Sequence, residues 1–145
     1  MSRETEAIAQ RFHMEIFQHG RLEVADDIVS RDFINHFPGY PKEWRRGPEG
    51  VKKYAAALRT AFPDLYITHE ETLSGGDVVM IRWTMTGTHK GAIFGIAPTG
   101  KAVKVTGIDL YRVWGPRIAD LWQGWDQYGM LQQMGVVSLA GQAKA

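Results

Sequence analysis

The sequence contains no cysteine among its 145 residues. This absence excludes disulfide frameworks, thiolate nucleophiles and cysteine-based zinc sites. An excess of one charge is missing as well, because 17 Lys and Arg face 16 Asp and Glu and leave a formal net charge of +1. So small a net charge offers no electrostatic basis for binding nucleic acid or a membrane surface, and we expect neither as a partner.

Long apolar runs are also missing. No segment approaches the roughly 18 consecutive apolar residues of a membrane-spanning helix, and the charged start MSRETEAIAQRF lacks the apolar core of a signal peptide. We therefore expect a cytoplasmic protein. The length matches one domain, so residues 1–145 are expected to form a single domain whose small, polar end, 136–145, frays.

The first part of the chain carries apolar residues at helical spacing. This pattern predicts a helix over 4–18 and a second short helix over 21–29. A third helix is expected between Pro48, which suits a first helical turn, and Pro63, which ends the periodic pattern. Residues 32–37 separate the last two helices as a short extended piece, followed by a loop rich in Pro, Gly and aromatic residues.

The second part of the chain has the alternation of strands. One hairpin is predicted from 65–73 and 77–88, and another from 101–114 and 117–127, with a short closing helix over 128–135. Helices followed by hairpins, without β-α-β alternation, predict the α+β class. We expect a curved antiparallel sheet packed on three N-terminal helices, with a pocket between the layers.

Familiar cofactor and nucleophile motifs do not occur. The sequence has no GxGxxG, no GxxxxGK[ST] and no GxSxG, so neither a nucleotide cradle nor a serine elbow is expected. Its five histidines form no HExxH or other close ligand pair. We therefore expect no metal and no nucleotide cofactor.

Two aspartates in apolar strand segments are the first candidates for catalysis. Asp109 interrupts a run of strand-forming residues, where aspartate is disfavoured. Asp126 ends the next strand, and alternation places Trp122, Gly124 and Asp126 on one face. Carboxyl groups beside an apolar wall bind protons more tightly, which suits proton abstraction. Asp126 can equally be the N-cap of the last helix.

Other side chains are candidates with simpler alternatives. His36 lies among aromatic residues and is either catalytic or a hydrogen-bonded structural residue. Arg82 is either the counter-ion of an interior carboxylate or a solvent-facing residue, and His89 is either a ligand contact or a turn residue. The expected substrate-binding residues are Phe33, Tyr40, Trp44, Arg82, His89, Phe94 and Trp122.

An ordered series of short segments resembles a known family. They are DFINH at 32–36, FPD at 62–64, RWTMTGTH at 82–89, GIAPTG at 95–100, GID at 107–109, RV at 112–113, RI at 117–118, and Trp122 with Asp126. Together they span roughly residues 5 to 135. The sequence thus resembles the SnoaL-like polyketide cyclase and ester cyclase group within the nuclear-transport-factor-2-like superfamily.

This resemblance implies a cone-shaped α+β barrel around a deep pocket. Cyclases of the family close a polyketide ring by intramolecular aldol condensation, without metal or organic cofactor, and Asp126 matches their acid/base aspartate. Those cyclases carry a histidine two residues earlier, where this sequence has Gly124, which counts against the polyketide assignment itself.

Residues 107–112 also resemble a strand of ketosteroid isomerases that supplies a protonated aspartic acid to an oxyanion hole, and Asp109 matches that aspartate. The basic aspartate of those isomerases would fall near His36.

The expected function is therefore acid/base catalysis on an apolar or aromatic carbonyl compound, with Asp126 as base and with His36 and Asp109 polarising oxygens. The alternatives are an isomerase or dehydratase, of lyase or isomerase type, and a non-catalytic, small-molecule-binding dimeric module. A homodimer is expected if Trp83 or Trp125 lies on an exposed sheet face. Solvent exposure of both Asp109 and Asp126 would favour the non-catalytic module.

Overall fold

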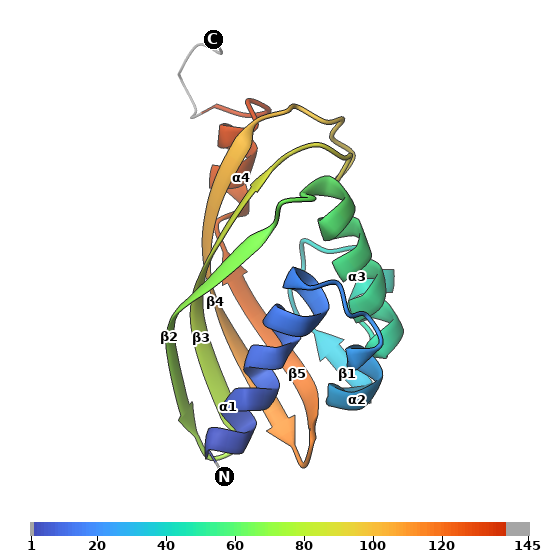
Figure 1. Ribbon diagram of the computed structural model, residues 1–145, viewed down its shortest axis with the longest axis vertical. Coiled ribbons are helices and arrows are strands. Elements are labelled where there is room, and N and C mark those ends of the chain that lie inside the picture. Colours follow the sequence, from blue (N-terminus) through green and yellow to red (C-terminus); the bar gives the residue numbers. More distant parts are fainter. Residues whose placement is uncertain (1, 139–145) are drawn as a thin grey trace.

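A single curved sheet of five strands forms the framework of the computed structural model, which describes residues 2–138 (Figure 1). β2 (Tyr66–Gly75), β3 (Val78–Thr88), β4 (Ala102–Trp114) and β5 (Arg117–Trp125) follow one another as an antiparallel meander. β1 (Val29–Asn35) lies beside β5 in parallel, so the expectation of a wholly antiparallel sheet is wrong at this edge.

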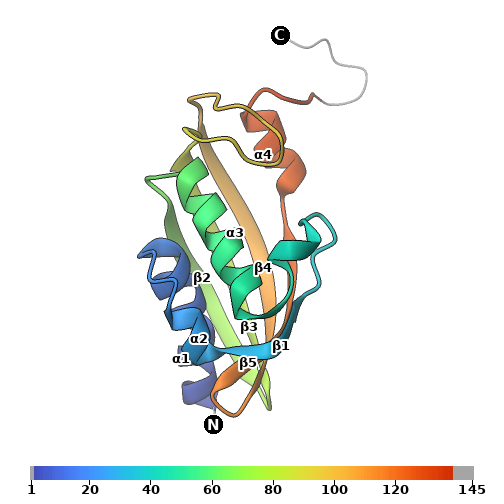
Figure 2. The ribbon, with the colours of Figure 1, turned by 90° about the vertical axis from the view of Figure 1, so that its right-hand side faces the viewer.

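Helices from the N-terminal part of the chain cover one face of the sheet, as expected for the α+β class (Figures 1 and 2). They are α1 (Ser2–Arg11), which runs directly into the π-helix η1 (Phe12–Gln18), α2 (Val24–Ile28) and α3 (Gly47–Ala61). A single 3-10 turn, η2 (Lys42–Trp44), precedes α3, and α4 (Gln127–Gln133) follows the sheet. In residues 2–138 no helix is long and apolar enough to span a membrane.

The expected elements agree with the observed ones to within a few residues at most ends. Part of the predicted frayed segment, 139–145, lies outside the described residues, and residues 136–138 follow α4 without helix or strand.

The sheet has an inner face, toward the helices, and an outer face. Side chains of β3 and β4 alternate between these faces, so that every second residue is buried. On β4 the inner face carries Gly107, Asp109 and Tyr111, while Ile108 and Leu110 lie outside. The core therefore lies between the inner face and the helices, and a carboxylate stands within it.

Gly107 leaves room for two tryptophan side chains on the inner face. A Cβ at this position would lie 2.4 Å from the Trp83 ring and 2.7 Å from Cβ of Trp125. Contacts this short are not tolerated, so a larger residue would displace the Trp83 ring and Trp125.

The connection between β3 and β4 folds over one end of the inner face. Phe94 and Gly95 are the central residues of a turn closed by Ile93 and Ile96, and they have φ values of 51° and 73°. Positive φ is unusual for a bulky residue such as Phe94, which packs against Trp44. The turn is thus held by its surroundings in a strained conformation.

Candidate active site

A largely apolar pocket lies between the inner face of the sheet and the helices. Five of its lining residues carry a side-chain nitrogen or oxygen, namely His13, Tyr54, Trp83, Gln123 and Trp125. The pocket and its opening together contain ≈ 560 Å³ of empty space. Most of this space is narrow, and the centre of a water molecule fits in only ≈ 40 Å³ of it. The pocket therefore has room for a few waters.

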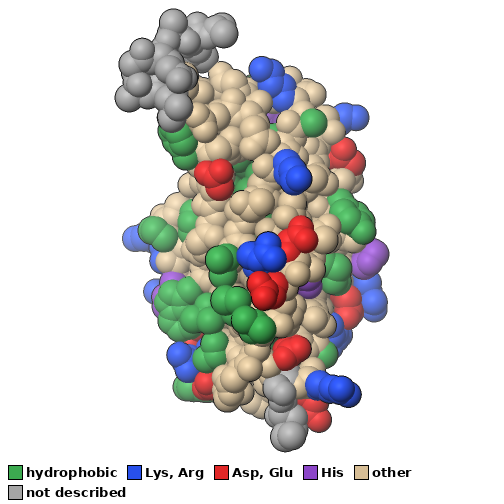
Figure 3. Space-filling model, turned by 90° about the vertical axis from the view of Figure 1, so that its left-hand side faces the viewer, with side chains coloured by type: hydrophobic (Ala, Val, Ile, Leu, Met, Phe, Trp, Pro, Cys, Tyr) green, Lys and Arg blue, Asp and Glu red, His purple; other side chains and the backbone are tan. Residues whose placement is uncertain are grey.

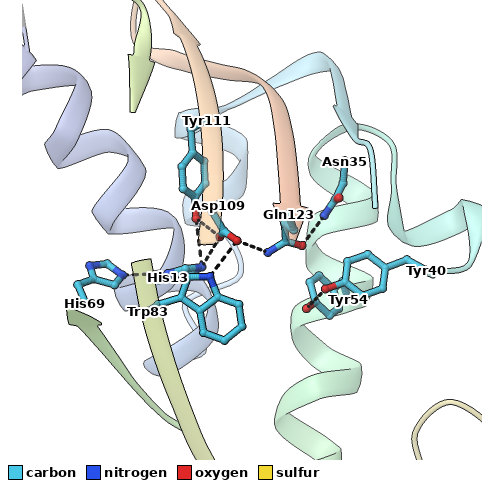
Figure 4. A network of polar contacts seen from close by, with 9 residues as sticks. All are labelled: His13, Asn35, Tyr40, Tyr54, His69, Trp83, Asp109, Tyr111 and Gln123. Carbon is cyan, nitrogen blue, oxygen red and sulfur yellow. Dashed lines mark hydrogen bonds and ion pairs between the residues drawn. The ribbon is translucent and has the colours of Figure 1, made fainter. Parts of the chain in front are cut away.

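Asp109 stands behind this wall and is fully buried. Its Oδ1 accepts hydrogen bonds from Trp83 Nε1 at 2.9 Å and from Gln123 Nε2 at 3.0 Å (Figure 4). Its Oδ2 accepts one from the Tyr111 hydroxyl at 2.7 Å and lies 3.0 Å from His13 Nε2. Four donors fill the acceptor capacity of the two oxygens, which suits a carboxylate enclosed in an apolar core.

His13 connects Asp109 to a second histidine. The Tyr111 hydroxyl donates to Asp109, so its oxygen, 3.1 Å from His13 Nε2, is left to accept from that nitrogen. The network therefore places a proton on His13 Nε2, and His13 Nδ1 lies 2.9 Å from His69 Nε2. Burial, together with His13, lowers the pKa of His69 to about 4, so that His69 is neutral at pH 7.

Local geometry explains how these side chains meet. His13 belongs to the π-helix η1, and such wide turns often occur at functional sites. His69 precedes a shift of register between β2 and β3, and it lies opposite Trp83 on the inner face. The parallel strand β1 adds Asn35, which donates from Nδ2 to Gln123 Oε1 at 3.0 Å. This bond fixes the Gln123 amide with its NH₂ toward Asp109.

Two tyrosines lie on the side of this network opposite His69 (Figure 4), and Tyr54 lines the pocket. The hydroxyls of Tyr40 and Tyr54 are 2.5 Å apart, and both side chains are buried. Burial raises the pKa of each phenol, that of Tyr40 well above its ordinary value. Both therefore remain protonated at neutral pH.

The structure separates the two aspartates that the sequence singled out. Asp109 faces the interior, as its strand context indicated, whereas Asp126 is exposed. Trp122, Gly124 and Asp126 do share a face, but it is the outer one, so the expectation that Asp126 stands beside an interior indole is wrong. Asp126 Oδ1 accepts from the backbone N–H of Gly129 at 2.9 Å and caps α4, which is the alternative noted above.

Other expected site residues also lie outside the pocket. His36 pairs with Asp120 at 2.9 Å and stacks on Trp122 on the outer surface, with ring centroids 4.6 Å apart. Arg82 is exposed and pairs with Glu71 at 3.4 Å, so it is not the counter-ion of an interior carboxylate.

The remaining expected residues are divided between pocket and core. Phe94 lines the pocket directly. Trp44 stacks on Tyr54, and Phe33 is buried against Phe12 in the core. His89 is fully buried, but its Nδ1 accepts from the backbone N–H of Thr99 at 3.1 Å. His89 therefore anchors the loop between β3 and β4 rather than facing the ligand space.

Sequence reasoning missed His13, His69, Trp83 and Gln123 as members of this network. Strand alternation carries part of the signal, since Trp83 lies on the same face as buried Ile81. For His13 the signal was proximity to Phe12 on an apolar stripe. Across residues 2–138, no group of three or more acidic or histidine side chains has the arrangement of a metal site.

Comparison with known proteins gives consistent relatives. The model of a family described as SnoaL-like polyketide cyclase matches residues 7–134. A candidate polyketide cyclase from Acidithiobacillus ferrooxidans is 33% identical with a TM-score of 0.79, over 90% of this chain and 94% of that one. IdmH, a candidate polyketide cyclase from Streptomyces antibioticus, is 30% identical with a TM-score of 0.74, over 92% and 99% respectively. The search of curated proteins gives no match.

Proposed function

Because the chain belongs to the SnoaL-like polyketide cyclase family, we propose that its inner pocket performs acid/base chemistry on an apolar carbonyl compound, such as aldol-type cyclisation of a polyketide. The observation that carries this proposal is the contact between buried Asp109 and His13 in the pocket wall. A carboxylate that holds one imidazole nitrogen leaves the other as a proton acceptor, the arrangement used in many acid/base sites.

The reaction begins when His13 Nδ1 takes a proton from carbon next to a carbonyl group. The electrons of the C–H bond move to the carbonyl oxygen, which becomes an enolate, and Asp109 stabilises the imidazolium that forms. The enolate carbon then attacks a second carbonyl of the same molecule, and His13 returns its proton to the new alkoxide. Because His69 Nε2 lies 2.9 Å from His13 Nδ1, this step requires the His69 ring to turn aside.

The apolar lining supports this chemistry in two ways. It excludes water, which would otherwise protonate the enolate, and it fixes a flat ligand near the reacting groups. A ligand larger than a few waters needs a wider space, and we infer that movement of the turn at Phe94, which lines the pocket and has a positive φ, provides it.

Ring closure and double-bond isomerisation share the first proton transfer. They differ in whether the enolate attacks a second carbonyl or is protonated at another carbon. We place cyclisation first because of the family, and the same test of proton abstraction serves both.

We also propose that the outer sheet face mediates a homodimer. Trp83 and Trp125 point inward, so the expected indoles do not serve this purpose. Instead, Leu73, Met80, Leu110 and Trp122 lie opposite one another across four strands and form an apolar row on the outer face, part of the surface in Figure 3. Sedimentation of the wild type as a dimer and of Leu110→Lys as a monomer is the expected result; a monomeric wild type contradicts it.

Exchange of deuterium into an enolisable ketone tests the catalytic proposal. 2-Tetralone, a flat aromatic ketone, is incubated with the protein in D₂O, and loss of its α-proton signal is followed by NMR. We expect the wild type to accelerate exchange and His13→Gln to reduce that acceleration at least 100-fold, the usual scale of a general base. The exposed His19→Gln is the matched control and keeps full activity. No acceleration by the wild type, or an unchanged rate in His13→Gln, contradicts the proposal.

A further inference from the structure

The indole N–H of Trp125 is a buried donor that makes no hydrogen bond to any described residue. Leaving such a group unsatisfied costs roughly 1–3 kcal/mol, so a buried donor without an acceptor calls for an explanation. Trp125 belongs to the pocket wall, on β5, two residues beyond Gln123. Its N–H is therefore available to an acceptor that the pocket receives.

The Tyr40–Tyr54 pair adds a second donor at the same end. One of these two hydroxyls donates its proton to the oxygen of the other. The proton of the accepting hydroxyl is not used in this bond and can be donated to another group. The indole of Trp125 lies close enough to Tyr40 to lower its pKa, against the larger effect of burial, although their geometry does not reach a hydrogen bond. The indole N–H and the tyrosine pair thus lie together.

Aromatic rings surround these donors. Phe37 stacks on Trp125 with centroids 5.5 Å apart, Trp44 stacks on Tyr54 at 5.3 Å, and Phe94 packs against Trp125 at 6.3 Å. These rings keep water out and favour a flat, apolar molecule. Hydrogen bonds to an oxygen in such an enclosure are stronger than in water.

We propose that Trp125, together with the Tyr40–Tyr54 pair, binds the carbonyl oxygen of a flat aromatic or polycyclic ketone and stabilises the enolate oxygen formed from it. The pocket then has a donor end at these three residues and a proton-accepting end at His13. This inference rests on the proposed function for the enolate, but oxygen binding itself is measurable without turnover.

Paired ligands isolate the contribution of the oxygen. 2-Tetralone and tetralin share one carbon frame, and tetralin lacks the oxygen. We expect the wild type to bind 2-tetralone at least 10-fold more tightly than tetralin, and we expect Trp125→Phe to reduce that ratio to about 2, with Tyr54→Phe in between. The solvent-facing Trp114→Phe is the matched control and keeps the wild-type ratio. A ratio that is unchanged in Trp125→Phe overturns the proposal.

A spectroscopic readout on the wild type guards against misfolding of the variant. In ¹⁵N-labelled protein, the indole resonance of Trp125 is expected to move downfield on addition of 2-tetralone and not on addition of tetralin. Binding of 2-tetralone without that movement overturns the oxygen site. If the resonance moves but the protein does not accelerate deuterium exchange, the oxygen site is supported and the catalytic proposal is refuted. The failure of one proposal is therefore distinguishable from the failure of the other.

Discussion

The two faces of the sheet carry the same three residue types in different surroundings. On the inner face, His13 lies 3.0 Å from Asp109, and Trp83 donates to that carboxylate. On the outer face, His36 lies 2.9 Å from Asp120 and stacks on Trp122. The inner histidine and aspartate side chains are 7% and 0% exposed, and the outer ones are 33% and 27% exposed.

Burial, and not residue type, separates a candidate site from a surface pair. Water screens the outer pair, and such pairs contribute about 0–1 kcal/mol. The inner pair is shielded from water and contacts protein groups at fixed positions. The charge of Asp109 therefore depends on the donors around it, and those donors depend on Asp109 as their acceptor. This dependence makes the inner pair able to hold a proton at a defined place, which a solvated pair does not do.

Removal of each carboxylate gives the largest contrast. Asp109→Ala leaves the donors of Tyr111, Trp83 and Gln123 buried without an acceptor, so we expect a loss of about 3–5 kcal/mol in the free energy of unfolding. Asp120→Ala is expected to lose about 0–1 kcal/mol. Urea denaturation measures both. The isosteric Asp109→Asn, with an expected loss of about 1–3 kcal/mol, serves if the alanine variant does not fold. Equal losses at the two aspartates would remove the distinction between the faces.

Two glycines provide the next contrast. Gly107 lies against the Trp83 ring and Cβ of Trp125, so we expect Gly107→Ala to cost about 1–3 kcal/mol and to shift the near-UV circular dichroism of these tryptophans. Gly124 lies on the outer face, and a Cβ added there would have no other atom within 4 Å. Gly124→Ala is therefore expected to change stability by less than about 0.5 kcal/mol. If Gly107→Ala changes neither the stability nor the near-UV circular dichroism, the inner indoles are loosely packed.

His69 extends the contrast to pH. In the folded protein its pKa is lowered to about 4, whereas the unfolded chain binds the proton near the ordinary 6.5. The unfolded state therefore holds more protons between these values, and stability falls as pH decreases from 6.5 to 4. The groups facing His69 are His13, from η1, and Asp109, from β4. His69→Gln is expected to reduce this loss by about 1 kcal/mol, allowing for solvent screening of a partly exposed ring.

Melting temperatures of His69→Gln and of the control His19→Gln, measured between pH 4 and 7, check this expectation. An unaltered slope in His69→Gln would place the acid sensitivity elsewhere.

The fold was predictable because its signals are local. Turn residues and alternation located both hairpins, and the family resemblance supplied the architecture. The faces were not equally predictable. Alternation groups Trp122 with Asp126 correctly, but a pattern of period two is unchanged when the strand is turned over, so it does not say which group faces inward. The parallel pairing of β1 with β5 likewise has no local signal.

The site was predictable in part for a related reason. Asp109 was found because aspartate is unusual within a strand. Its partner His13 is distant in sequence, and the contact depends on how the π-helix η1 turns its side chains toward the sheet. The strained φ of Phe94 depends on the aromatic rings around it. Such features arise from tertiary packing, which neither composition nor spacing encodes.

The smallest expected effect is also the sharpest test of the two faces. Asn is as good an N-cap as Asp, so Asp126→Asn should keep α4 and the stability of the fold. If catalysis belongs to the inner face, this variant exchanges the α-protons of 2-tetralone within about threefold of the wild-type rate. If instead the late aspartate is the base, the exchange falls by about 100-fold or more. In that case the outer face around Asp126 becomes the site, and the buried network of Asp109 becomes structural support.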